Sequence, residues 1–349
     1  MRSKKFRSTL ITFGIVIAAF IACQAMISTG GGMTQLSSRV SSCPICAYVV
    51  MAVSLNLTVG ISGELSLGHA GFMSVGAFSG IVMAMWLSKG MGVANETLCL
   101  LLAILTGGAA AGVAGVVIGI PVLRLRGDYL AIVTLAFGEI IRNVINCLYI
   151  SLDGQRLHIA FNNPNVAGKL LVNGPAGATG VNKMATFGMG FALTLFTLFV
   201  VLNLIDSRSG RAIMAIRDNR IAAEAMGLNV TKYKMMAFVT SAVLAGMAGA
   251  LYGLNFSTVA ASKFKFDTSI LVLVFVVLGG IGNIRGSIIS ATLLTILPEL
   301  LRAFANYRML IYAIVLILVM LATNNPTLRG MVERIIPRGK GRKKEADEA

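Results

Sequence analysis

Long apolar stretches, separated by short polar segments, repeat along almost the whole chain. A helix needs about 20 apolar residues to cross the hydrocarbon layer of a bilayer, and fewer where protein surrounds it. Ten stretches come near this length, so the pattern predicts an all-α fold, a polytopic membrane helical bundle of about ten spans in two related halves. The predicted spans cover residues 9–27, 45–61, 67–88, 97–119, 128–149, 185–205, 236–256, 268–281, 286–301 and 308–322.

Composition and charge agree with this pattern. The chain is 56% hydrophobic and 13% charged, whereas soluble domains carry about 25% charged residues. If the N-terminus is inside and the spans alternate, about two thirds of the 30 basic residues fall on inside segments, which predicts that both termini are cytoplasmic. The basic residues behind the net charge of +16 then lie at segment ends, where they meet lipid headgroups. We therefore expect no nucleic-acid partner. The first-half spans lie within 45–149, the second-half spans within 236–322, and residues 323–349 form a basic cytoplasmic tail.

The polar loop 207–234 separates two apolar stretches and is patterned as two short helices. Ser209-Gly210 opens a predicted first helix, Arg211 to Arg217. Asp218-Asn219 predicts a break and a new N-cap, because short polar side chains accept hydrogen bonds from free helix amides. A second helix, Arg220 to Met226, is predicted to end at Gly227, and Arg220 can pair with Glu224 one turn later.

The loop has two interpretations. It is either a solvated, positively charged inside loop or a docking site for a soluble partner. Bulky residues favour a packed contact: Ile213, Ile216, Met226 and Leu228.

Two glycine-rich segments, 56–72 and 278–287, interrupt the apolar pattern, one in each half. Glycine permits unwound backbone, which survives in a membrane only where it is buried in protein or faces a cavity. Paired interrupted helices predict a translocation pathway, and tight turns with close helix packing are the alternative. The candidate pathway residues are Asn56, Gly63, Glu64, Ser66, Gly68, His69, Gly280, Gly282 and Asn283. Glycines four apart favour packing in other spans: Gly76/Gly80, Gly108/Gly112, Gly115/Gly119 and Gly249/Gly253.

Ionisable groups at membrane depth are functional candidates. Glu64 and His69 serve either the pathway or a turn at headgroup level. Asp128 is predicted to cap its helix, and Glu139 can form an ion pair with Arg142 at i,i+3. The spacing of Cys43 and Cys46 lacks the further ligands of a zinc site and fits packing at a helix entrance.

Enzyme chemistry has little support in the chain. It contains no G-x-x-x-x-G-K-[ST] phosphate-binding loop, so any ATP hydrolysis must belong to another polypeptide. We expect no catalytic residue, metal site or cofactor in this chain. The longest outer loop, 151–184, contains two turn-forming clusters, Asn-Asn-Pro-Asn and Asn-Gly-Pro-Ala-Gly.

Four motifs together resemble the membrane permeases of branched-chain amino acid ABC importers, the LivM type. They are N-L-x-x-G-x-S-G-E-L-S-L-G-H-A-G-F from Asn56, the segment from Leu125 to Arg142, the loop segment from Gly210 to Val230, and G-G-I-G-N-I-R-G-S from Gly279. One departure is Asn324 to Gly330, where the family has an arginine before the proline. That departure leaves the role of the tail open.

The resemblance implies an inner-membrane protein of a bacterial or archaeal cell. It implies two cytoplasmic ATPase subunits that bind ATP and Mg, a second permease subunit and an extracytoplasmic solute-binding protein. The loop would couple to the ATPase through Arg211, Arg217, Asp218, Asn219, Arg220, Glu224 and Gly227. Two alternatives stay open: an ion-coupled secondary transporter that uses Glu139, and an importer of this class that carries urea or short amides.

Overall fold

The computed structural model describes residues 42–93, 95–125, 127–153, 156–162 and 168–300, and the single positions 14, 16, 310, 313, 314 and 317. The predicted spans 9–27 and 308–322 therefore lie almost entirely outside the described residues. The predicted tail 323–349, with its departure from the family motif, lies outside them completely.

Helices occupy every predicted span that falls within the described residues. They are α3 (Ser42–Asn56), α4 (His69–Met85), α5 (Glu96–Val122), α6 (Asp128–Asn146), α7 (Phe187–Asp206), α10 (Val230–Gly253), α11 (Phe266–Gly279) and α12 (Ile284–Leu300). A π-helical turn extends α3, η1 (Leu57–Ile61), and another extends α4, η2 (Trp86–Gly90). In this part of the chain five helices are long and apolar enough to cross a membrane, those at Cys43–Ile61, His69–Gly90, Glu96–Val122, Phe187–Asp206 and Val230–Gly253. Within the described residues, five of the ten predicted spans are thus supported by a helix of sufficient length and apolar composition.

Three helices, α4, α5 and α10, pack tightly on one another through glycine. A Cβ atom at Gly76 of α4 would lie 2.1 Å from the carbonyl oxygen of Gly246 in α10. At Gly249 of α10 it would lie 2.0 Å from the carbonyl oxygen of Met73, and at Gly112 of α5 it would lie 2.7 Å from Val243. Small residues let backbones approach where lipid provides no hydrophobic drive for association. The packing interpretation of the G-x-x-x-G pairs is confirmed.

The prediction of an all-α chain is wrong in one place. Five short antiparallel strands form a sheet in the order β2-β1-β3-β4-β5. Their bounds are β1 (Leu148–Asp153), β2 (Arg156–Phe161), β3 (Lys169–Asn173), β4 (Ala178–Thr179) and β5 (Thr258–Val259). The strand β1 begins where the predicted span 128–149 was still helical, because α6 ends at Asn146. The last strand comes from a distant segment, since Ala178 pairs with Val259.

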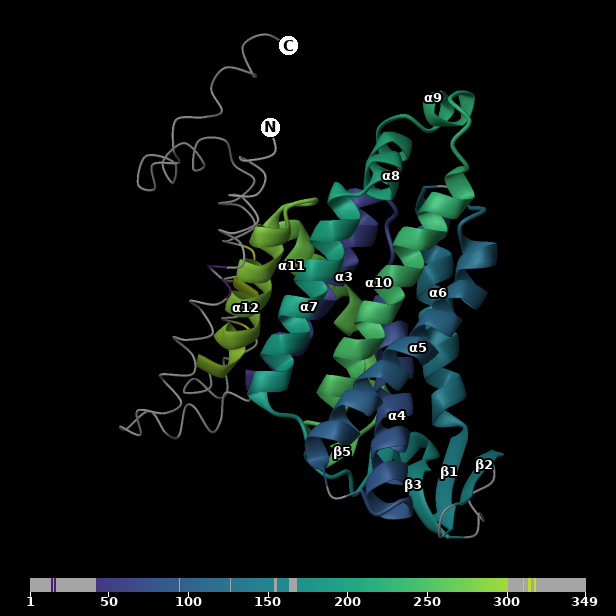
Figure 1. Cartoon of the computed structure of the whole chain (residues 1–349), viewed down its shortest axis with the longest axis vertical. Coiled ribbons are helices and arrows are strands. Elements are labelled where there is room, and N and C mark those ends of the chain that lie inside the picture. The colour runs from purple at the N-terminus through teal and green to yellow at the C-terminus, as the bar shows by residue number, and fades with distance from the viewer. Residues whose placement is uncertain are drawn as a thin grey trace. The chain divides into compact units, whose positions relative to one another are not determined.

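The two polar regions lie at opposite ends of the long helices (Figure 1). The helices α8 (Arg208–Asp218) and α9 (Arg220–Ala225) lie at the end that is uppermost in the view, and the strands lie at the other end. The helix α7 runs between them, with its start toward the end that carries the strands and its end at α8. The loop 207–234 and the sheet are therefore on opposite sides of any membrane that these helices cross.

Candidate functional site

The two loop helices form because each has a side-chain cap. Ser207 Oγ accepts a hydrogen bond from the amide of Gly210 at 3.0 Å and begins α8. Asn219 Oδ1 accepts from the amide of Ala222 at 3.0 Å and begins α9. The predicted break and N-cap are confirmed. The first helix begins at Arg208, earlier than predicted, and the second ends at Ala225, one residue early.

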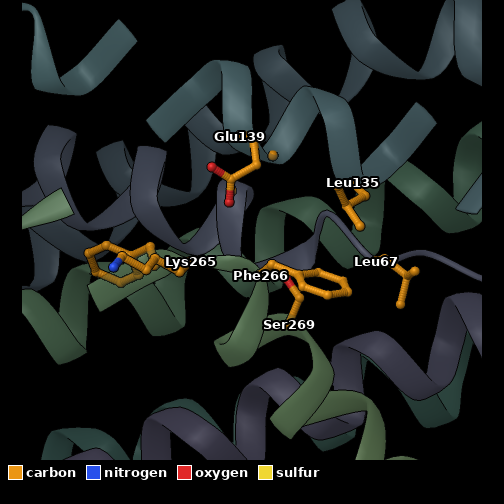
Figure 2. Close-up of a pocket in the computed structure, with 9 residues that line it drawn as sticks. Leu67, Leu135, Glu139, Lys265, Phe266 and Ser269 are labelled. Atoms are coloured by element: carbon orange, nitrogen blue, oxygen red, sulfur yellow. The ribbon is translucent and has the colours of Figure 1, made fainter. Parts of the chain in front are cut away.

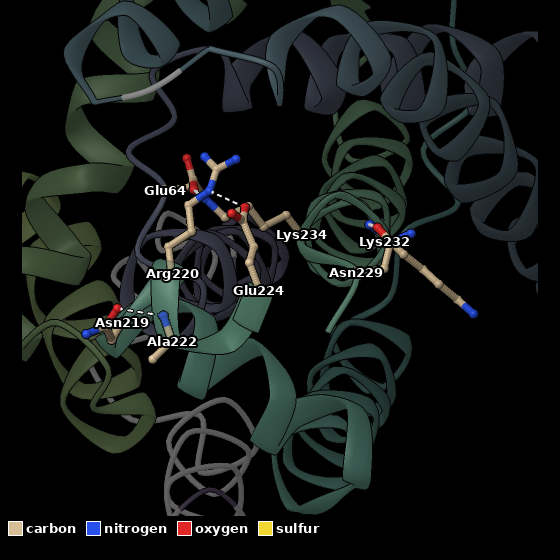
Figure 3. Close-up of polar contacts among 8 residues, drawn as sticks. All are labelled: Glu64, Asn219, Arg220, Ala222, Glu224, Asn229, Lys232 and Lys234. Carbon is tan, nitrogen blue, oxygen red and sulfur yellow. Dashed lines mark hydrogen bonds and ion pairs between the residues drawn. The ribbon is translucent and has the colours of Figure 1, made fainter. Parts of the chain in front are cut away.

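The end of α9 is a glycine C-cap, as predicted. Gly227 has a φ of +80°, which an L side chain rarely adopts. The amide of Leu228 then reaches back to the carbonyl of Ala223 at 3.1 Å, which closes the last helical turn. The predicted ion pair is also present, with Arg220 Nε 2.9 Å from Glu224 Oε1 (Figure 3).

One face of the loop packs on its own chain. Ile213 and Ile216 are buried, and Ile216 joins a small core with Ala223 and Val230, against which Leu228 and Tyr233 pack. Of the four bulky residues that suggested a partner contact, Ile213, Ile216 and Leu228 are used internally.

The opposite face of the loop is open. Met226 is 83% exposed and Ile221 is 80% exposed. The predicted coupling residues Arg211, Asp218, Asn219, Glu224 and Gly227 are exposed on the loop, and Arg220 is partly exposed. The loop is thus anchored on one side and presents charged and apolar side chains on the other.

Arg217 differs from the other coupling candidates because it also points into the molecule. Its Nη1 atom donates to the carbonyl oxygen of Gly60 at 2.9 Å, while Nε and Nη2 donate to Asp218 Oδ1 at 3.0 and 2.9 Å. Gly60 lies in η1, within the first glycine-rich segment. A Cβ atom at Gly63 would lie 2.6 Å from Arg217 Cγ, and the φ of +74° at Gly63 disfavours any other residue.

The two glycine-rich segments are in direct contact, 226 residues apart in sequence at the bond that joins them. Asn56 Oδ1 accepts from the amide of Gly282 at 2.8 Å, and Asn56 Nδ2 donates to Ser287 Oγ at 2.9 Å. Gly280 and Gly282 have φ of +91° and +80°, so this turn depends on glycine. The amide of Asn283 donates to the carbonyl of Gly280 at 2.9 Å, and the carbonyl of Asn283 accepts from Ser287.

Glu64 and His69 have separate surroundings. Glu64 forms an ion pair with Lys234 at the start of α10, and the two side chains are only 12% and 14% exposed (Figure 3). His69 is buried at the start of α4, where its Nε2 lies 2.8 Å from Ser54 Oγ. Neither residue is an exposed group at a surface turn.

The remaining pathway candidates line the connection between η1 and α4. Ser66 is buried, and its hydroxyl has no hydrogen-bond partner within the described part of the chain. A Cβ atom at Gly68 would lie 2.0 Å from the carbonyl oxygen of Thr134, so α6 packs directly on this connection.

Sequence reasoning missed several polar residues around these segments. Ser241 of α10 donates to the carbonyl of Ser54 at 2.6 Å and accepts from Thr58 Oγ1 at 2.8 Å. Ser287 ends the fourth motif and Lys234 ends the polar loop, and the sequence alone predicts a partner for neither. Their position could have indicated a partner, because a serine or lysine at the edge of an apolar span is costly to bury without a hydrogen bond or an ion pair.

A small pocket that is partly open to solvent lies between α4, α6 and α11. Figure 2 shows Glu139 of α6 above Phe266 and Ser269 of α11. Glu139 Oε2 is 2.7 Å from Arg142 Nη2, which confirms the predicted ion pair. Asp128 is the first residue of α6 and not its cap, because Gly127 occupies the N-cap position without a side-chain bond.

Cys43 and Cys46 are buried near the start of α3, which fits the packing role expected of them. Among the described residues no group of three or more His, Cys, Asp or Glu side chains is placed to hold a metal ion.

Comparison with known proteins agrees with the resemblance that the four sequence motifs show. A family described as branched-chain amino acid transport system / permease component matches residues 43–320. The high-affinity branched-chain amino acid transport system permease protein LivM of Salmonella typhimurium is 33% identical over 308 residues, 78% of this chain and 66% of that protein. LivM of Escherichia coli K12 gives the same values.

A shorter match covers 155 residues of the permease protein LivH of Escherichia coli K12, at 32% identity, 44% of this chain and 48% of that protein. The chain thus spans just under two thirds of the length of the LivM relatives. No solved structure matches.

Proposed function

Because the chain belongs to the family of permease components of branched-chain amino acid transport systems, we propose that it is the membrane-spanning subunit of an ATP-driven ABC importer for branched-chain amino acids. It is a multi-pass membrane protein and a transport subunit. The observation that supports the ATP-driven part is the two-helix loop α8–α9, which is anchored on one face and open on the other.

The open face fits a cytoplasmic ATPase. Ile221 in α9 and Met226 at its C-cap are large apolar side chains at 80% and 83% exposure, amid charged neighbours. Apolar anchors with a polar rim are the usual energetic centre of a protein interface. The chain itself has no phosphate-binding loop, so ATP and Mg would bind in the partner.

The proposed assembly follows from this division of roles. Two cytoplasmic ATPase subunits would dock on the loops of two permease subunits, and a solute-binding protein would deliver the substrate at the end that carries the sheet. In this arrangement α8–α9 and both termini are cytoplasmic, and the coupling residues are Arg211, Arg217, Asp218, Asn219, Arg220, Glu224 and Gly227. Arg217 differs from the others because it binds the carbonyl of Gly60 in its own chain and is not assigned to the docking contact.

The translocation pathway would pass the two glycine-rich segments, where Asn56 meets Gly282. Close backbone contact between interrupted helices is the arrangement in which a small displacement separates two surfaces. The proposed pathway residues are Asn56, Gly63, Glu64, Ser66, Gly68, His69, Gly280, Gly282 and Asn283.

Docking is tested by capture of the ATPase subunits of the same transport system on the purified, detergent-solubilised chain. We expect Ile221→Glu and Met226→Glu each to weaken capture by about tenfold or more, because each places a charge in an apolar contact. The matched control is Ile159→Glu, an exposed position on β2 at the opposite end of the helices. Equal capture by all three variants would show that the ATPase binds elsewhere.

Energy source and substrate are tested in proteoliposomes of the complete importer. We expect uptake of labelled leucine to require ATP on the loop side and to be competed by isoleucine and valine. Competition by urea or acetamide alone would assign the other substrate class.

Uptake that continues without ATP and stops when an ion gradient is removed would favour a secondary transporter. That mechanism needs a carboxylate that can take up an ion, whereas Glu139 is held by Arg142.

A further inference from the structure

We propose that the π-helical turn η1 transmits movement of α8–α9 to the α11–α12 junction, with Arg217 and Asn56 as its two contact residues. This inference rests on the proposed ATP-driven function and names the element through which the docked loop would act. It assigns Arg217 to transmission, and leaves docking to the open face at Ile221 and Met226.

The first contact lies on the loop side. A helix end leaves carbonyl groups without intrahelical partners, and a cation there is favoured by the helix dipole. The guanidinium of Arg217 provides a hydrogen-bond partner and a positive charge at this helix end, because its Nη1 donates to the carbonyl of Gly60 at 2.9 Å. Gly63 permits the approach, since any side chain there would overlap the Arg217 side chain. The guanidinium is fixed from the other side by Asp218, so a shift of α8 carries it along.

The second contact lies on the membrane side, at the residue that precedes η1. Asn56 is fully buried, and its amide makes two bonds to the α11–α12 region, one to the backbone of Gly282 and one to Ser287. Ser287 is also fully buried. Both of these hydrogen bonds of the Asn56 side chain cross the junction, where separation would leave buried polar groups unpaired.

The two contacts are linked inside η1 by a glycine. A Cβ atom at Gly60 would lie 2.0 Å from Asn56 Oδ1 and 2.3 Å from the amide nitrogen of Gly282. The carbonyl of Gly60 therefore bonds to the loop while its Cα rests on the Asn56–Gly282 contact. A displacement of Gly60 toward the junction would therefore displace that contact.

The π-helical turn suits a two-state element. Its i→i+5 bonds, such as Ser62 N to Leu57 O at 3.1 Å, are less favourable than α-helical ones, and such turns occur often at functional sites. A change from π to α bonding would shorten the bonds of η1 from i→i+5 to i→i+4 and so change the orientation of Gly60 relative to Asn56. The ion pair of Glu64 with Lys234 ties the segment that follows η1 to α10.

The test uses the complete importer in proteoliposomes, with the native cysteines of this chain replaced by serine. Asn56→Cys and Ser287→Cys are introduced together, since their side chains are in contact. Because the substitutions remove the Asn56–Ser287 hydrogen bond, we expect the reduced double-cysteine chain to take up less leucine than the unmodified chain, and oxidation to abolish the ATP-driven uptake that is left. The rate of disulfide formation should differ by about fivefold or more with and without ATP, the lower range of allosteric coupling.

Arg217→Gln is then added to the double-cysteine chain. We expect it to abolish the effect of ATP on disulfide formation while capture of the ATPase stays unchanged. The matched control is Arg208→Gln, another arginine exposed on α8, which should preserve both. If the cysteine pair does not assemble, Arg217→Gln and Ser287→Ala are compared instead. Each should lower the leucine moved per ATP hydrolysed, and together they should lower it no further, because they interrupt one path.

The outcomes separate the inference from the proposed function. Uptake that persists after oxidation, or an unchanged ATP effect in Arg217→Gln, would overturn the inference alone. Loss of ATPase capture in Arg217→Gln would also overturn it, because the residue would then be a docking contact. Failure of the unmodified chain to capture the ATPase or to use ATP would refute the proposed function itself.

Discussion

The substitution Gly76→Ala tests the packing of α4 against α10, on which the arrangement of the junction depends. A Cβ atom at position 76 would lie 2.1 Å from the carbonyl oxygen of Gly246 and 2.3 Å from its Cα. Both are backbone atoms of the facing helix, so no side chain can rotate away. Carbon–oxygen contacts need about 3.3 Å, and the two helices must therefore separate by roughly 1 Å at this level.

The magnitude follows from opposing effects. Insertion of a methyl group into a packed interface costs about 1–3 kcal/mol and sometimes more, and a backbone obstacle places this site at the upper end. Alanine in place of glycine favours the helix by up to about 1 kcal/mol. We therefore expect Gly76→Ala to lower the free energy of unfolding by about 2 kcal/mol.

Gly188→Ala is the matched control, because Gly188 in the first turn of α7 has nothing within 4 Å of the added atom. It should be neutral or gain up to about 1 kcal/mol. The assay is reversible unfolding in mixed micelles with increasing dodecyl sulfate, followed by circular dichroism. If both variants unfold within about 0.5 kcal/mol of each other, the close approach of α4 and α10 is refuted.

Three further predictions concern the loop and its surroundings. In unfolding measurements Glu64→Gln or Lys234→Met alone should cost about 3 kcal/mol by leaving a largely buried charge, and the double variant should recover most of this; additive losses would contradict the pairing. Asn219→Ala should remove the cap of α9, cost about 1 kcal/mol and weaken ATPase capture, whereas Asn219→Ser should keep both; equal behaviour of the two variants would count against the cap. With Cys23 replaced by serine, a membrane-impermeant maleimide should label the exposed Cys147 on intact cells and not in inside-out vesicles, and the reverse pattern would invert the proposed orientation.

Local features were predictable because their causes lie within a few residues. The break at Asn219, the cap at Gly227 and the Arg220–Glu224 pair each depend on neighbours within one helical turn. Glycines four apart likewise mark a flat helix face whatever the partner helix is. These patterns were enough to locate the loop and the two interrupted segments.

The sheet could not be predicted in the same way. Its strands β4 and β5 have two residues each, too short to show an alternating pattern, and their pairing joins Ala178 to Val259 across 81 residues. The loop had a similar limit, since its sequence shows bulky residues without showing which face they occupy. Only packing against Val230 and Tyr233 turned Ile216 inward and left Met226 outside.

By itself the sequence predicted the apolar helices that lie within the described residues, the caps at Asn219 and Gly227, and the family that the chain resembles. These properties follow from hydrophobic period, capping chemistry and motif order, all of which are short-range or additive along the chain. The tertiary structure alone decided that Arg217 reaches Gly60 and that Asn56 joins Gly282 and Ser287. Such contacts depend on how distant helices settle against each other, because a hydrogen bond forms only when packing brings both partners within about 3 Å.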